Sequence, residues 1–396
     1  MSTRKTSKTV EKADSESAQN AAMDVSWAEK GSFKVEFVDG LFGETDDATA
    51  RTLRAIAGGD SPRVILVADS NVVQRTEGLG TRIGRYIQAN GIVLAAPPIV
   101  MSGGEKLKTD NMQSVQKIVS VALDAKVGKN DVMVALGGGS LLDVAGYAAA
   151  QVRGGMPLVR MPTTPAAMVD GAFADTAALN TPNIKDAVRV PCRPAAVLID
   201  TSFSDTVLDG VWRAGSGEII RQAAVRDSAF MKKLVKSAEA LGKRDAAAMD
   251  EAIRAAVVSR VSRGSSDFAL WSALRLEAMS GYKLPHGYAV AIGVCIDCAY
   301  AVERGLLKPD DQEAICRAIA DAGALDGLGH SRHLLEQADS VLRGLDAWCL
   351  ATGSETRTLC VGIGKAKPEP EPDRDAYRKV LQEFIDASDV TVESMV

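Results

Sequence analysis

The order of strand-like and helix-like segments changes once along the chain, and this change constrains the fold more than any other feature. Short β-rich runs at residues 32–38 and 63–68 ("SFKVEFV" and "RVILVA") are followed by the helical pattern of residues 81–91. Further runs at residues 92–100 and 131–139 lie on either side of the helical pattern of residues 111–127. Such alternation is typical of a parallel sheet with helices packed on it.

Beyond about residue 200 the strand-like runs nearly disappear, and helical periodicity begins with residues 215–241. We therefore expect a Rossmann-like α/β domain with a mainly parallel sheet at residues 31–200, followed by an all-α domain at residues 201–396. A cleft between such domains is a usual place for a small-molecule site. The polar residues 1–30 are expected to be a disordered tail, and the proline-rich residues 365–375 a linker or surface loop.

Composition narrows the classes of partner. A net charge of -5, with no block of like charge in the body of the chain, disfavours nucleic acid. No apolar run reaches the length of about 18 residues that a membrane span requires. The first residues lack the apolar core of a secretory signal. We expect a cytoplasmic protein whose main partner is a small molecule.

The cysteines and histidines give weaker signals. Cys295 and Cys298 lie in a helical region, where the two thiols would share one face and could pair or bind metal, alone or with His286. Buried free thiols are the simpler interpretation, because the chain contains no second pair at this spacing. The other histidines, His330 and His333, are interpreted as exposed polar residues near a helix start, with a metal role as the alternative.

The strongest local motif is a hydrophobic strand that runs into Gly137, Gly138 and Gly139 and then into an amphipathic helix. Backbone amides in such a turn can approach a ligand closely, and a helix N-terminus favours a diphosphate. The spacing differs from G-x-G-x-x-G, so the common dinucleotide fingerprint is not matched. A tight turn without a ligand is the alternative interpretation.

Six segments, taken in order and spacing, resemble the sugar phosphate cyclases, the superfamily of dehydroquinate synthase. They are "GGGSLLDVAGYAAA", "RMPTTPAAMVDGAFADTAALNTPNIKDA", "AAVLIDTSF", "GSGEIIRQAAVRD", "DFALWSALRLE" and "LPHGYAVAIG". The segments "VDGLF", "GGEKLKT", "DFALW" and "VGIGKAK" are more similar to the sedoheptulose 7-phosphate cyclases, the branch of 2-epi-5-epi-valiolone synthase. The resemblance implies a dehydroquinate synthase-like fold for nearly the whole chain beyond its N-terminal tail.

The resemblance also implies a defined chemistry. In this family NAD oxidises a secondary hydroxyl, phosphate leaves by elimination, the hydride returns, and the opened sugar closes by an intramolecular aldol step. A divalent ion such as zinc, held by one Glu and two His, polarises the oxygen that is oxidised. A homodimer and a role in cyclitol biosynthesis, as part of secondary metabolism, are implied in the same way.

The NAD-binding residues implied by the resemblance follow strands of the first domain. They are Asp69 and Asn71 for the adenosine side, Glu105 and Lys108 as a second contact, Gly137, Gly138, Gly139 and Asp143 for the diphosphate, and Thr163 and Thr164 beside the nicotinamide. Without a cofactor, Asp69 and Asn71 would be turn formers and Thr163 a cap.

The implied metal site is incomplete. Glu218 and His286 correspond to two metal ligands, whereas Leu270 stands at the position of the other histidine ligand and Leu274 at that of the catalytic histidine. Leucine has no lone pair, so a three-ligand zinc site cannot form from these positions. Two ligands would hold zinc or cobalt much more weakly.

The implied phosphate and polyol pocket is partly kept. Asp170, Asn180, Lys185 and Arg263 match the family, whereas Arg221 replaces a lysine. Thr176 likewise replaces a lysine, Tyr288 replaces a glutamate, and Asp186 and Asp267 replace asparagines. Arginine is no neutral exchange for lysine, because its planar fork cannot act as a point donor.

Three functions fit this pattern. The first is an NAD-dependent sugar phosphate cyclase, a phosphate-eliminating lyase, that acts on a sugar such as sedoheptulose 7-phosphate without the usual zinc. The second is an NAD-dependent enzyme with a changed reaction on a cyclitol or sugar phosphate, with Lys185 or Asp170 as the base. The third is a non-catalytic paralogue that serves as a subunit or regulator.

Overall fold

The structure, a computed structural model, describes residues 31–326 and 328–386. The expected tail at residues 1–30 lies outside the described residues. All elements named below belong to the unit that begins at Phe33.

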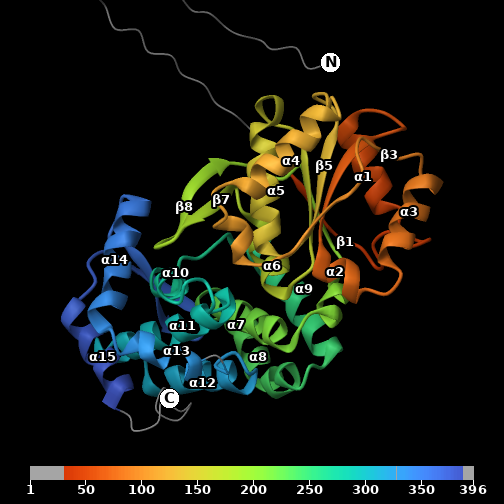
Figure 1. Cartoon of the computed structure of the whole chain (residues 1–396). Coiled ribbons are helices and arrows are strands. Elements are labelled where there is room, and N and C mark those ends of the chain that lie inside the picture. Colours follow the sequence, from red (N-terminus) through yellow and green to blue (C-terminus); the bar gives the residue numbers. More distant parts are fainter. Residues whose placement is uncertain (1–30, 327, 387–396) are drawn as a thin grey trace, which may run out of the picture. The chain divides into compact units, whose positions relative to one another are not determined.

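A seven-stranded sheet dominates the first half of the chain (Figure 1). Its order is β1 (Lys34–Phe37), β9 (Ala196–Ile199), β6 (Leu158–Pro162), β5 (Val132–Gly137), β2 (Arg63–Asp69) and β3 (Val93–Leu94), with β4 (Ile99–Met101) also paired to β2. Every pairing in this sheet is parallel, which confirms the prediction. The strand β5 is buried along its whole length, as expected for a sheet covered on both faces.

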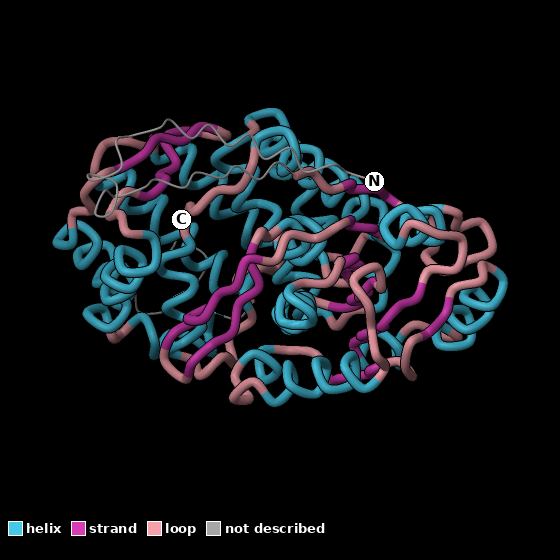
Figure 2. The backbone as a smooth tube through the Cα atoms, turned by 90° about the horizontal axis from the view of Figure 1, so that it is seen from above, coloured by secondary structure: helices cyan, strands magenta, loops and turns pink. Residues whose placement is uncertain are grey.

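Helices connect and cover these strands, and the view from above shows the strands lying among them (Figure 2). They are α1 (Ala48–Ala57), α2 (Ser70–Arg75), α3 (Leu79–Ala89), η1 (Glu105–Lys108), α4 (Gln113–Asp124), α5 (Gly139–Gln151), η2 (Val152–Gly154), α6 (Pro165–Val169) and η3 (Gly171–Phe173). The helix α5 packs along β5 and β6. Its first residues therefore lie at the carboxyl end of β5.

Two local expectations for this half need correction. The strand expected at residues 92–100 is divided into β3 and β4, because Pro97 and Pro98 between them lack the amide hydrogen that a sheet ladder needs. The antiparallel hairpin of β7 (Thr176–Thr181) and β8 (Ile184–Pro191) was not predicted. This hairpin contacts α5 on one side and α10 on the other (Figure 1).

The chain beyond β9 is helical, as predicted. It contains η4 (Thr201–Thr206), α7 (Asp209–Arg226), α8 (Ser228–Gly242), α9 (Ala246–Arg263), α10 (Leu270–Met279), α11 (His286–Glu303), α12 (Pro309–Asp321), α13 (Leu328–Leu335), α14 (Ala338–Thr352) and α15 (Arg374–Asp386). One antiparallel hairpin, β10 (Arg357–Gly362) with β11 (Lys365–Glu369), adds to these helices. The expected loop at residues 365–375 is therefore wrong for its first five residues, which form β11.

The helix α11 packs against α7 and α10 and is buried over most of its length. Glycines allow α7 and α11 to approach closely. A Cβ atom at Gly287 would lie 1.8 Å from the carbonyl oxygen of Ala214, and one at Gly217 would lie 2.5 Å from the carbonyl oxygen of Gly287. This contact brings Glu218, the residue after Gly217, toward His286, the residue before Gly287.

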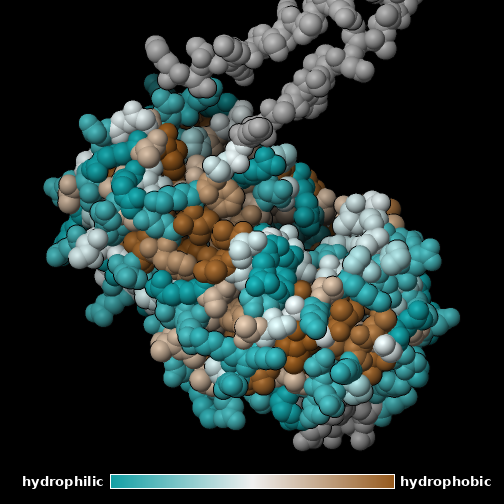
Figure 3. Space-filling model, turned by 180° about the vertical axis from the view of Figure 1, so that it is seen from behind, coloured by the Kyte–Doolittle hydropathy of each residue, from teal (hydrophilic) through white to brown (hydrophobic). Residues whose placement is uncertain are grey.

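The cysteines and the surface can be compared with the expectations from the sequence. Cys295 and Cys298 are buried and free, which confirms that interpretation. Among the described residues, no helix is both long and apolar enough to cross a membrane. The back of the molecule is largely hydrophilic, with apolar surface gathered in a few areas (Figure 3). The expected homodimer stays a prediction.

Candidate active site

The glycine turn lies where the direction of the sheet connections reverses. The chain passes from β2 outward to β3 and β4, and then returns to β5 on the other side of β2. Ligands of open α/β sheets bind at such a switch point, beyond the carboxyl ends of the strands. The ends of β2, β5 and β6 meet here, because Gly137 pairs with Pro162 and the amide of Thr163 donates to the Gly137 carbonyl at 3.1 Å.

Asp69, at the end of β2, organises the loop beside the glycine turn. Its Oδ1 accepts hydrogen bonds from the backbone amides of Asn71 at 2.8 Å and Gly103 at 3.2 Å. A Cβ atom at Gly103 would lie 2.0 Å from the Asp69 carboxylate, so only glycine fits there. The turn-forming role of Asp69 and Asn71 is thus present in the structure.

The start of α5 and the end of β6 carry polar groups without a side-chain partner. Gly138 is the N-cap of α5 without a side-chain cap, and a Cβ atom at Gly139 would meet nothing within 4 Å. The Oγ1 of Thr163 is buried without a hydrogen-bond partner, whereas Thr164 caps α6 by accepting from Ala167 at 3.4 Å. Other buried hydroxyls such as those of Thr49 and Ser216 also have no partner, so Thr163 is singled out by its position beside the glycine turn, where its amide donates to Gly137. The turn therefore fits the diphosphate and adjoining groups of a dinucleotide.

Glu105, predicted as an NAD contact, joins the glycine turn to the β7–β8 hairpin. Its carboxylate accepts from Ser140 Oγ at 2.6 Å, from Asn180 Nδ2 at 2.8 Å and from Lys185 Nζ at 2.6 Å. Burial raises the pKa of Glu105, but Lys185 and Lys108 outweigh this effect and lower the pKa to about 2. The carboxylate therefore stays charged, and it connects predicted cofactor residues with predicted catalytic residues.

Lys108 makes a second link between α5 and the β7–β8 hairpin. Its Nζ donates to Asp143 of α5 at 2.6 Å and to Asp186 of β8 at 2.5 Å. Burial lowers the pKa of Lys108, but Asp143 and Asp186 raise it well above the ordinary value. Lys108 thus joins Asp143 of α5 to Asp186 of β8 and holds the hairpin on α5.

Lys185 extends the network into the helical half through a residue that the sequence analysis missed. Its Nζ lies 3.2 Å from Glu277 Oε2, and Glu277 Oε1 lies 2.7 Å from Nδ1 of His286. Burial lowers the pKa of Lys185, whereas Glu277 and Glu105 bring it above the ordinary value. Burial also lowers the pKa of His286, but Glu277 and Glu218 raise it to about 9. Lys185 is therefore held as a charged donor, and its role as the base stays a prediction.

Glu218, the first predicted metal ligand, is held by its neighbours on α7. Arg221 Nε donates to Oε2 at 3.0 Å, Arg221 Nη2 donates to Oε1 at 2.6 Å, and Gln222 Nε2 donates to Oε1 at 2.9 Å. Burial raises the pKa of Glu218, but Arg221 lowers it below the ordinary value. The Glu218 Oε2 atom lies 3.9 Å from His286 Nε2, so the structure does bring the two predicted ligands together.

The donor set does not fit a metal ion. Among residues 31–326 and 328–386, no group of three or more His, Cys, Asp or Glu side chains is arranged to hold one. Leu270 and Leu274 are both half-buried on α10 and supply no donor atom. Zinc sites in proteins use at least three protein ligands, and of the three predicted positions only Glu218 and His286 carry a donor atom.

Asp170 and Arg263, both predicted as catalytic, have different surroundings. Asp170 Oδ1 accepts from Arg260 Nε at 3.2 Å, and its Oδ2 lies 3.7 Å from Arg221 Nη2. Arg263 instead donates to the carbonyl of Arg226 at 2.7 Å and pairs with Asp227 at 3.1 Å. Asp170 is thus part of the cluster around Glu218, and Arg260 is a second residue that the sequence analysis missed.

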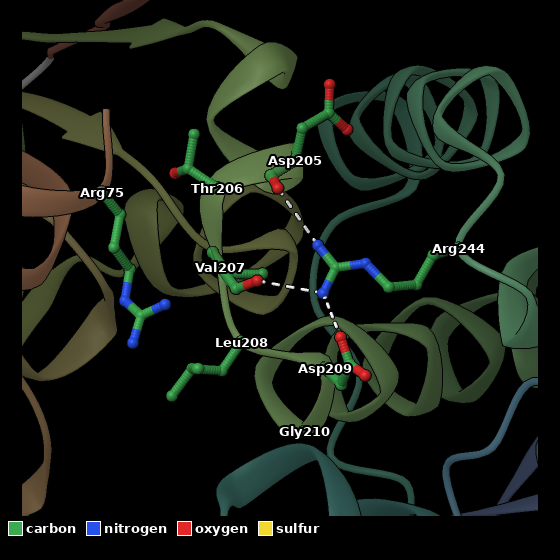
Figure 4. Close-up of a pocket in the computed structure, with 8 residues that line it drawn as sticks. All are labelled: Arg75, Asp205, Thr206, Val207, Leu208, Asp209, Gly210 and Arg244. Atoms are coloured by element: carbon green, nitrogen blue, oxygen red, sulfur yellow. Dashed lines mark hydrogen bonds and ion pairs between the residues drawn. The ribbon is translucent and has the colours of Figure 1, made fainter. Parts of the chain in front are cut away.

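A separate surface hollow of about 790 Å³ lies between α2 and the start of α7 (Figure 4). It is lined by Arg75, Asp205, Thr206, Val207, Leu208, Asp209, Gly210 and Arg244. Arg244 donates to the carbonyl of Val207 at 3.0 Å and also bonds Asp209, so its charge is already balanced. None of the predicted site residues lines this hollow.

Comparisons with known proteins identify the family of the chain. The sequence model described as 3-dehydroquinate synthase N-terminal matches residues 98–213, and the one described as 3-dehydroquinate synthase C-terminal matches residues 215–326. A 3-dehydroquinate synthase of Rhodopseudomonas palustris (strain BisB18) is 32% identical over 267 residues, which cover 63% of this chain and 69% of the relative. One from Nitrobacter winogradskyi is 32% identical over 300 residues, covering 71% and 76%.

Solved structures show the same fold. ValA, a 2-epi-5-epi-valiolone synthase from Streptomyces hygroscopicus subsp. jinggangensis 5008 with NAD+ and Zn2+ bound, superposes with a TM-score of 0.78 at 22% identity, covering 91% of this chain and 98% of that one. A 2-deoxy-scyllo-inosose synthase complexed with carbaglucose-6-phosphate, NAD+ and Co2+ gives a TM-score of 0.68 at 18% identity, covering 89% and 96%. At these identities the likeness concerns the fold.

Proposed function

The chain belongs to the 3-dehydroquinate synthase family, within the sugar phosphate cyclases, and from this membership we propose that it is an NAD-dependent enzyme that acts on a phosphorylated sugar without a bound divalent metal. One observation carries the proposal. An unbroken series of contacts runs from Ser140 of the glycine turn through Glu105, Lys185 and Glu277 to His286. The glycine turn and the region of Glu277 and His286 are thus joined by one network of contacts.

The proposal that NAD binds here is supported by polar groups beside the glycine turn. The amides at the start of α5 and the Thr163 hydroxyl point to a ligand with a diphosphate and further polar groups. When bound, NAD would accept a hydride from a substrate carbon and later return it. Asp69 and Gly103 shape the wall beside it.

The residues around Glu218 would bind and orient the substrate. Asp170 has an oxygen near Arg221 and another on Arg260, so it is the carboxylate placed to take the proton of a substrate hydroxyl. Lys185 and Asn180 would donate hydrogen bonds to substrate oxygens from the hairpin side. Phosphate elimination and ring closure by an aldol step, as in the sugar phosphate cyclases, are the reaction we propose for a sugar such as sedoheptulose 7-phosphate.

A second candidate is favoured by Leu274. The family's catalytic histidine position is occupied there by a group that cannot transfer a proton. The reaction would then stop at oxidation or epimerisation of a cyclitol or sugar phosphate, without elimination of phosphate. Asp170 would serve as the proton acceptor in either reaction. The two candidates differ in whether inorganic phosphate is released.

The test incubates the purified protein and NAD with a panel of six- and seven-carbon sugar phosphates, including sedoheptulose 7-phosphate. Inorganic phosphate and the carbocyclic product are measured by colorimetry and mass spectrometry. Phosphate release that is lost in Asp170→Asn supports the cyclase, and either reduced NAD or an epimer of the substrate, without phosphate release, supports the second candidate. A protein that binds NAD and turns over none of these substrates would contradict both and favour a non-catalytic paralogue.

A further inference from the structure

We propose that the Arg221 guanidinium is the resident cation of this site and that it occupies the electrostatic place of a divalent metal. The inference deepens the proposed function. Only the role of Arg221 toward a substrate depends on that function. Its structural part, the exclusion of metal, stands on the contacts of Arg221 alone.

Arg221 takes up the carboxylate that a metal would need. Its Nε and Nη2 atoms bind Glu218 as a fork, and Gln222 adds a further donor on the same carboxylate. The side chains of Glu218 and Arg221 are each 1% exposed, so the pair is shielded from solvent. A fork of this kind is strong because both partners are charged and the geometry is bidentate. A divalent ion at Glu218 would have to displace these bonds or lie beside a positive guanidinium.

Direct bonds also connect the three helices that a metal ion would bridge. Arg221 of α7 donates from Nη1 to the carbonyls of Ser266 at 2.6 Å and Phe268 at 3.3 Å, in the segment that leads into α10. Glu277 of α10 holds His286 of α11 at 2.7 Å. The connection from α7 to α10 and that from α10 to α11 are therefore made by side chains. We infer that the helical half needs no metal for its integrity.

One N–H of Arg221 is left for a substrate. An arginine has five N–H donors. Those on Nε and Nη1 and one on Nη2 are engaged by Glu218, Ser266 and Phe268. Asp170 Oδ2 lies 3.7 Å from Nη2, which is beyond hydrogen-bond range. A substrate hydroxyl that approaches from the side of Asp170, whose side chain is 30% exposed, would give its proton to Asp170 with its oxygen near Arg221 Nη2.

This arrangement favours a substrate oxygen that gains negative charge during the reaction. A guanidinium carries its charge permanently, and it needs no metal supply. It supplies one positive charge where zinc would supply two, so the expected assistance is electrostatic and weaker than that of a Lewis acid.

The experiment measures metal binding rather than turnover. The unmodified protein, Leu270→His, and the double variant R221K/L270H are each titrated with Co²⁺ after dialysis against a chelator. Binding is followed by the visible absorption of protein-bound cobalt and by elemental analysis. Lysine keeps a positive charge at position 221 but cannot fork onto both oxygens of Glu218. The matched control R221K/L274H places a histidine one helical turn further along α10.

The expected result is no stoichiometric cobalt in the unmodified protein and at least about tenfold tighter binding in R221K/L270H than in Leu270→His, the size of effect seen when groups around a ligand are changed. Stoichiometric metal in the unmodified protein would overturn the proposal even if the variants fail to fold. If R221K/L270H binds Co²⁺ no more tightly than Leu270→His, or no more tightly than R221K/L274H, the role of Arg221 in excluding metal is refuted. NAD titration of the same samples is a separate readout, and its failure would refute the proposed function but not the exclusion of metal.

Discussion

Replacement of Glu105 by glutamine tests the link between the glycine turn and the β7–β8 hairpin. The Glu105 carboxylate accepts from Ser140, Asn180 and Lys185, and its pKa falls from an ordinary 4.5 to about 2. A shift of this size corresponds to about 3 kcal/mol of stabilisation of the folded chain. Because the pKa is lowered by folding, this stabilisation is complete at neutral pH and is lost as the pH falls from about 4.5 toward 2.

We expect Glu105→Gln to reduce the free energy of unfolding by about 2–3 kcal/mol at pH 7. The loss should be about 1 kcal/mol smaller at pH 4, where the unfolded wild-type chain already binds a proton at this carboxyl group. Urea unfolding followed by tryptophan fluorescence at both pH values measures the difference. Glu239→Gln, which removes an exposed partner of Lys243, is the control and should change nothing. An equal loss at both pH values, or no loss, would refute the reasoning.

Three further predictions follow from single contacts. Gly139→Asp should fold, because nothing lies within 4 Å of the added Cβ, but its charge should weaken NAD binding at least about tenfold in a fluorescence titration, whereas Gly128→Asp, equally open, should not. Tyr377→Phe removes the 2.7 Å hydrogen bond to Asp297 and should cost about 1–3 kcal/mol, so an unchanged thermal midpoint would argue against that contact. Lys185→Met removes the cation between Glu105 and Glu277, although Glu277 keeps its contact with His286, and should cost about 3 kcal/mol in urea unfolding; a smaller loss than in Glu105→Gln would contradict the network.

The parallel sheet and the helical half could be predicted because their patterns are local. Alternation of strand and helix is visible in the sequence, and so is the glycine turn after β5. The β7–β8 hairpin was missed because its outer strand is largely exposed and its residues carry no hydrophobic run. The split of residues 92–100 could have been read from Pro97 and Pro98, which interrupt the apolar run.

The residues of the site could be predicted only through the resemblance of the sequence to a known family. Glu218, His286, Asp170 and Lys185 do lie in one connected region. Glu277 was missed, although its position seven residues after Leu270 places it on the same face of α10, where a buried acid was a signal. The partner of Arg221 could not be inferred from spacing alone, because a guanidinium one turn from a glutamate is most often an exposed pair.

The contacts of Glu105 and Lys108 show the limit of transfer by resemblance. Both were predicted to contact the cofactor, yet the structure ties them to Lys185 and Asp186 of the hairpin. These partners lie about 80 residues further along the chain, so only the fold brings them together. Whether either side chain also touches NAD stays a prediction.

Native mass spectrometry with elemental analysis of the purified protein tests the central claim most directly. The account predicts that each chain takes up one NAD and carries no stoichiometric divalent metal, before and after dialysis against a chelator. One zinc or cobalt ion per chain, or a folded protein that does not take up added NAD, would contradict it.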